Sequence, residues 1–193
     1  MVNLEYIVYY YSEASAIGGL KVLAPSTHGR KDVAFMAGLY LEEFEVGMTF
    51  EHATRRTVTE TDNVIFTSMT HNLAPLHLDA EYAKTTIYGQ RLMNSMYVLA
   101  LLGGICMQDT THGTTLGNLG FEDVKFPRPV FAGDTLRIRT EVVSARESKS
   151  REDSGIVIFR HQAINQRDEI VCDCRRAGLM LKRSWVEQNA ATS

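Results

Sequence analysis

The sequence predicts an α+β domain in which an antiparallel sheet wraps around one buried helix. Residues 94–107 are apolar on every helical face, so a helix there must be surrounded by protein. Residues 136–143, then 156–164 and 169–181, show the two-residue alternation of half-buried strands. Helices and strands do not alternate along the chain, which excludes a parallel α/β sheet.

Length and composition fit a single domain. The chain has 193 residues, of which 45% are hydrophobic and 22% charged. The net charge is −3 and no basic block occurs, which argues against a nucleic-acid partner. The longest apolar run, Met96–Ile105, is about half of the roughly 20 residues that cross a bilayer, so we expect no membrane partner.

The three cysteines indicate reduced thiols and an intracellular location. Cys106, Cys172 and Cys174 are an odd number in a chain this long, which is typical of reduced thiols inside a cell. Cys172 and Cys174 share one strand face, but no second pair could complete a zinc site, so we expect no metal. We expect a cytoplasmic protein, with a mitochondrial or peroxisomal matrix left open.

Three regions follow along the chain. Residues 1–37 are read as an N-terminal extension of unknown role, and they carry acidic residues in which transit peptides are poor. Residues 38–185 form the predicted domain, and residues 186–193 a C-terminal tail.

Local signals place the elements before the central helix. Residues 48–58 are rich in Thr, Phe and Val, which favours a strand. Thr59-Glu-Thr-Asp62 resembles a capping box that starts a helix. Pro75 disfavours helix in the residue before it, so that helix must end near residues 71–72. Asp79 is expected to cap a second short helix over residues 80–86, and Asn94 the central one.

A central helix enclosed by antiparallel strands is the hot-dog arrangement. Such sheets generally continue across a dimer interface, which also covers an exposed edge strand. We therefore expect a homodimer or a dimer of dimers.

The connection between the first two helices, Thr70–Asp79, carries the polar side chains best placed for chemistry. It holds two histidines, an amide, a proline and a carboxylate, and polar residues on a loop between rigid elements are favoured functional positions. Taken alone, however, His77 fits a loop histidine bonded to backbone, and Asn72 fits a helix C-cap. Sequence motifs of nucleotide-binding loops and serine hydrolases are absent.

Five short motifs in order resemble the MaoC-like dehydratases, the family of the (R)-specific enoyl-CoA hydratases. The resemblance runs from about residue 38 to 183. The motifs are Phe44–Gly47, Thr57–Thr59, the Asn-x-x-Pro-Leu-His-Leu-Asp stretch at 72–79, Asn94-Ser95 and Pro129–Asp134.

This resemblance implies a cofactor-free hydration of an α,β-unsaturated acyl-CoA thioester. His77 falls on the family's catalytic histidine, which exchanges protons near neutral pH. Ser95 falls on the residue whose backbone N–H stabilises the enolate oxygen, as a free N–H at a helix start can do. Asn94, beside it, is a candidate substrate-binding residue.

The chain departs from the family at Asn72, which stands where the catalytic aspartate is expected. An amide can orient water but cannot accept a proton as a carboxylate can, so His77 would be the sole acid–base group. Members that resemble this chain act on short methyl-branched dicarboxylyl-CoA thioesters, such as mesaconyl-, itaconyl- and β-methylmalyl-CoA. Their distal carboxylate would need a cation, for which Arg91 and Arg128 are the candidates.

Two other functions stay open at this point. A hot-dog thioesterase would share the fold and the CoA site, although such enzymes usually place a carboxylate near the central helix. A non-catalytic thioester-binding protein would explain the missing aspartate.

Overall fold

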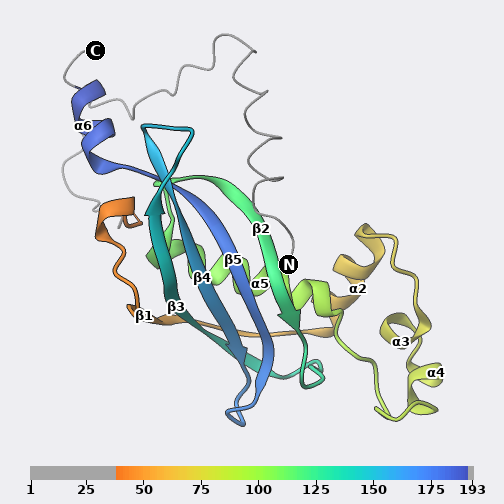
Figure 1. The fold of residues 1–193 in the computed structure, drawn as a ribbon. Helices are drawn as coiled ribbons and strands as arrows, with labels where there is room; N and C mark the ends of the chain where they lie inside the picture. The colour runs from red at the N-terminus through yellow and green to blue at the C-terminus, as the bar shows by residue number, and fades with distance from the viewer. Residues whose placement is uncertain (1–37, 191–193) are drawn as a thin grey trace, which may run out of the picture.

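The computed structural model describes residues 38–190, and its centre is a curved five-stranded antiparallel sheet with helix α5 against one face (Figure 1). The strand order is β1-β3-β4-β5-β2. The strands are β1 (Thr49–Thr57), β2 (Thr115–Lys125), β3 (Thr135–Glu147), β4 (Ser154–Ile164) and β5 (Ile170–Leu181). The predicted α+β fold is confirmed. The extension expected over residues 1–37 lies outside the described residues.

Helices α2, α4 and α5 begin where the capping signals predicted. Thr59 and Asp62 exchange the two hydrogen bonds of a capping box, Asp79 accepts from two backbone N–H groups, and Asn94 accepts from Met96. No helix within residues 38–190 is long and apolar enough to cross a membrane. The helical elements are η2 (Leu41–Glu43), α2 (Glu60–Met69), α3 (Pro75–Leu78), α4 (Ala80–Lys84), α5 (Ser95–Thr110) and α6 (Arg183–Ala190), the last of which spans the expected boundary at residue 185.

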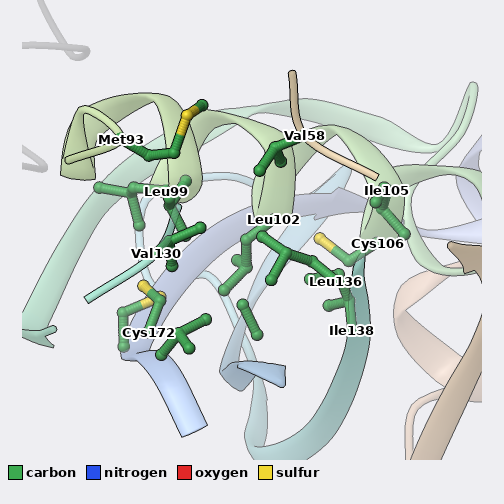
Figure 2. Close-up of a cluster of buried hydrophobic side chains, with 14 residues drawn as sticks. Val58, Met93, Leu99, Leu102, Ile105, Cys106, Val130, Leu136, Ile138 and Cys172 are labelled. Carbon is green, nitrogen blue, oxygen red and sulfur yellow. The ribbon is translucent and has the colours of Figure 1, made fainter. Parts of the chain in front are cut away.

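Helix α5 buries one side against the sheet and leaves the other side open. Leu99, Leu102 and Ile105 pack on Leu136 and Ile138 of β3 in the main core (Figure 2). On the opposite side Met96 and Met107 are 53% and 40% exposed. The apolar pattern predicted that protein surrounds the helix, and within residues 38–190 the sheet covers one side of it.

Strand β2 was not predicted, and its sequence explains why. Residues 115–125 contain Gly117 and Gly120, and the pairing of β2 with β5 shifts register at three places. Each shift interrupts the alternation of inward and outward side chains on which a strand prediction depends. By contrast, β3 alternates regularly over its first eight residues, as predicted.

A chain of polar side chains crosses the core between α5 and the sheet. The Asp109 carboxylate lies 2.8 Å from Nδ1 of His52, and Nε2 of His52 lies 2.8 Å from the Thr140 hydroxyl. The same hydroxyl lies 2.8 Å from Nδ1 of His161, which is fully buried. Burial lowers the pKa of His161 well below its usual range, and the nearby cation Arg176 and His52 lower it further.

His161 should make the fold sensitive to mild acid. The unfolded chain binds a proton on this histidine near pH 6.5 whereas the folded chain does not, so stability is complete above that pH and falls below it. We expect the free energy of unfolding, measured with urea between pH 7.5 and 5, to fall by up to about 1.4 kcal/mol per pH unit from this group. His161→Gln should flatten the slope, and an unchanged slope would contradict this assignment.

Candidate active site

His77 lies in the one-turn helix α3, not in an irregular loop as expected. Pro75 is the first residue of this helix, a position where a missing N–H costs nothing and the fixed φ fits a helix. The sequence pattern missed α3 because four residues are too few for helical periodicity. Figure 1 shows α2, α3 and α4 grouped beyond the end of α5 at which that helix begins.

The histidine ring is held by a main-chain carbonyl. Nδ1 of the half-buried His77 lies 2.8 Å from the oxygen of Leu92. Because a carbonyl can only accept, Nδ1 must carry the proton and donate it. In the neutral ring, Nε2 then has a free lone pair, which is what a general base needs.

At Ser95, three residues after Leu92, helix α5 begins with a backbone donor that is unused within residues 38–190. The Asn94 side chain accepts from the N–H of Met96 at 3.0 Å. Ser95 is the first helical residue, so its N–H has no carbonyl within the helix, and it has no acceptor in the described part of the chain. The helix dipole adds partial positive charge at this point, so the Ser95 N–H is suited to bind an oxygen that gains negative charge.

Asn63 connects these two features, and the sequence analysis did not find it. Its side chain is 1% exposed. Nδ2 donates to the carbonyls of His77 and Leu92, both at 3.1 Å, and Oδ1 accepts from the N–H of Asn94 at 2.9 Å. The only sequence signal was an amide in the first turns of a predicted helix, where most amides face solvent.

Two further backbone hydrogen bonds hold Leu92 and Met93, the residues that lead into α5. The N–H of Leu92 donates to Leu76 in α3 at 3.2 Å, and the N–H of Met93 donates to Val130 at 2.9 Å. Val130 belongs to the sequence motif at residues 129–134. Motifs that lie far apart in the sequence therefore meet at one short stretch of backbone.

Two cavities flank the first turn of α5. One has a volume of about 290 Å³ and is lined by Ser95, Arg128 and mostly apolar residues. The other, an open groove of about 780 Å³, is lined by Asn72 and Asn94 together with apolar residues of α2, α5 and β2. The expected site residues thus divide between two adjoining cavities, with Ser95 and Arg128 in one and Asn72 and Asn94 in the other. His77 is connected to both through the backbone of residues 92–95, because its ring donates to the Leu92 carbonyl.

Comparison with known proteins identifies the family of this chain. Residues 42–162 match the model of the MaoC like domain family. The chain belongs to this family. Beta-methylmalyl-CoA dehydratase of Chloroflexus aurantiacus is 30% identical over 146 residues, 76% of this chain. That match covers only 41% of the dehydratase, so the chain spans less than half of this relative's length.

Solved structures confirm the hot-dog fold. A monoamine oxidase regulatory protein of Archaeoglobus superposes with a TM-score of 0.70 and 34% identity, covering 78% of this chain and 99% of that one. The Mycobacterium tuberculosis protein RV0216, described as a double hotdog fold, gives a TM-score of 0.67 at 25% identity, over 75% of this chain and 44% of that one. The MaoC-like domain described here therefore has the fold expected from its sequence.

The two arginines expected near the site have different surroundings. Arg91 pairs with Glu60 at 2.7 Å and donates to the carbonyl of Leu78 at 3.3 Å, so its charge is already neutralised. Arg128 lines the Ser95 cavity, but its side chain is 64% exposed and its nearest acid is Glu169 at 4.0 Å.

The cysteines of the MaoC-like domain are all buried, as an inert structural role requires. Burial raises the pKa of Cys106 to about 11, so its thiol remains protonated and is a poor nucleophile. No cluster of potential metal ligands occurs within residues 38–190.

Replacing Asn63 should destabilise the site more than an ordinary helix substitution. Asn63→Ala leaves the His77 carbonyl and the Asn94 N–H without their partner and removes one of the two donors to the Leu92 carbonyl. A buried polar group left unsatisfied costs about 1–3 kcal/mol. We expect a loss of roughly 3 kcal/mol in urea unfolding. Thr67→Val is the matched control, since Thr67 is buried one turn along α2 and its side chain makes only a 3.4 Å contact with Asn94. Equal effects of the two changes would contradict the role given to Asn63.

Proposed function

We propose that this MaoC-like domain catalyses the reversible hydration of an α,β-unsaturated acyl-CoA thioester. One observation carries the proposal. The carbonyl of Leu92 fixes Nδ1–H of His77, and three residues later the Ser95 N–H at the start of α5 is free. A base and an oxyanion donor are thus attached to the same short segment, as this reaction requires.

In the proposed reaction His77 transfers protons and the Ser95 N–H stabilises negative charge. Nε2 of His77 takes a proton from water as the water oxygen bonds to Cβ, and the double-bond electrons move onto the thioester oxygen. The Ser95 N–H stabilises that oxygen, an interaction typically worth about 2.7–4 kcal/mol in the transition state. The protonated His77 then gives its proton to Cα, which restores the neutral ring and completes the addition.

Asn72 serves in the proposed reaction as a holder of water. Its Oδ1 accepts from the N–H of Ala74 at 3.3 Å, which leaves one lone pair and both N–H bonds for other partners. These groups can orient the attacking water but cannot take its proton. All proton transfer is therefore assigned to His77.

A short methyl-branched dicarboxylyl-CoA is the substrate class we propose to test first. The name of the Chloroflexus relative, a beta-methylmalyl-CoA dehydratase, supports this choice. Mesaconyl-CoA should be compared with crotonyl-CoA, which has no second carboxylate.

His77→Gln should lower the hydration rate by about 100-fold or more, the usual contribution of a general acid–base group. The assay follows loss of the enone absorbance of crotonyl-CoA and mesaconyl-CoA. His71→Asn is the matched control, because His71 lies in the same segment with a φ of 54° that Asn tolerates well. Full activity of His77→Gln, with an unchanged thermal midpoint, would show that the mechanism is wrong.

The same assay separates the two alternatives. Hydrolysis would release free CoA thiol without prior loss of enone, but no Asp or Glu lines either of the two cavities described. A binding protein would bind the thioester without turnover, and Asn72→Asp would not create activity.

We also propose that two copies of this chain pair through β2 and the open side of α5. Strand β2 is an edge strand whose outer side has no partner in the described chain. Leu116, Phe121 and Val124 on β2 are 37–39% exposed, next to the open methionine face of α5. A second copy would extend the sheet along β2 and cover Leu116, Val124 and Met107, none of which lines the groove of Asn72.

Sedimentation velocity should give the mass of a dimer or of a dimer of dimers. Met107→Glu should shift the protein toward monomer, because it places a charge on the open face of α5. Val46→Glu, at a more exposed apolar residue in the turn before β1, should not. A wild-type protein that sediments as a monomer at micromolar concentration would rule out the pairing.

A further inference from the structure

Arg176 of β5 is a buried cation with no carboxylate partner among residues 38–190. The residue is 9% exposed, and its Nε and Nη2 atoms have no hydrogen-bond acceptor within residues 38–190. Its guanidinium carbon lies 5.3 Å from the centre of the Phe159 ring. The neighbouring Arg175 is half exposed instead, with Asp123 at 3.9 Å.

An unpaired buried charge is unfavourable for folding. A guanidinium loses much of its hydration when it is buried, and the face of one aromatic ring replaces only part of it. The nearby His161 cannot supply a counter-charge, because a histidine is either neutral or positive. The charge of Arg176 therefore needs an anion from outside the described chain.

The groove beside α5 leads to this cation. Arg176 lines the same 780 Å³ groove as Asn72, together with apolar side chains such as Phe66, Leu99 and Phe121. No Asp or Glu lines the groove. An apolar channel with a single buried cation suits an acyl chain that carries a negative charge at its far end.

The two free nitrogens indicate which kind of anion fits. Nε and Nη2 form one edge of the guanidinium, and Arg160 uses this same pair of atoms to hold the Asp173 carboxylate, at 3.1 and 2.6 Å. In Arg176 this edge has no acceptor in the part of the chain that the structure describes. Two parallel N–H groups match the two oxygens of a carboxylate.

We propose that Arg176 binds the carboxylate at the far end of the substrate's acyl group. The proposal rests on the proposed function in taking the groove as the acyl site. It replaces Arg91 and Arg128 as the expected partner of this carboxylate, and makes Arg176 the residue that selects dicarboxylyl over monocarboxylyl thioesters.

Binding of two saturated thioesters tests this subsite without requiring catalysis. Succinyl-CoA and butyryl-CoA have four acyl carbons each and differ in a terminal carboxylate or methyl group, and neither has a double bond to hydrate. By calorimetry, the wild-type protein should bind succinyl-CoA at least tenfold more tightly than butyryl-CoA. Arg176→Met should remove or reverse this preference, and Arg176→Lys should retain part of it. Arg175→Met is the control and should behave like the wild type.

The possible outcomes separate this proposal from the hydratase assignment. Equal wild-type affinities, or an equal loss of both ligands in Arg176→Met, would overturn the subsite even if enoyl-CoA is hydrated. A preference that depends on Arg176 would support the subsite even if no hydration is found. The thermal midpoint adds a further criterion, because Arg176→Met should be at least as stable as the wild type. A lower midpoint combined with an unchanged succinyl-CoA preference would show that a structural ion pair holds Arg176, and would also overturn the proposal.

Discussion

The carbonyl of Leu92 is the interaction on which the arrangement of this site depends. It accepts from the ring of His77 and from the side chain of Asn63, and so joins α2, α3 and the start of α5. Each hydrogen bond is ordinary, but together they fix the histidine tautomer and its relation to the free N–H of Ser95. A preorganised donor and base need no rearrangement when charge develops, which is the main advantage of such a site over water.

The sequence was most informative about residues whose structural role depends only on their neighbours in the sequence. The caps at Thr59 and Asn94 follow from side chains that bond to backbone two or three residues away, and the strand alternation of β3 follows from one buried face. Residues whose partners are distant in sequence could not be found this way. Asn63 bonds to groups 14 to 31 residues further along the chain, and Arg176 differs from Arg175 only in the face of β5 that it occupies.

The sequence indicated which residues belong to the candidate site, but not how they are arranged in space. His77 and Ser95 were named from motifs, whereas their connection through the Leu92 segment required the fold. The division of Asn72 and Ser95 between two cavities could not be anticipated either, since it depends on how α2 and β2 flank the first turn of α5. Motifs identify which side chains matter, and packing decides what each of them faces.

The hydrogen bonds that connect Asp109, His52, Thr140 and His161 depend on one another for their donor–acceptor direction. If His52 is neutral and donates to the Asp109 carboxylate, its other nitrogen must accept from Thr140, whose oxygen then accepts from Nδ1–H of His161. In the opposite arrangement, Nε2 of His52 donates to Thr140, whose hydroxyl turns to donate to His161, and His161 must carry its proton on Nε2. The tautomer of the fully buried His161 is thus linked to the partly exposed carboxylate of Asp109, three hydrogen bonds away. Switching between the two arrangements moves hydrogen atoms and leaves every heavy atom in place.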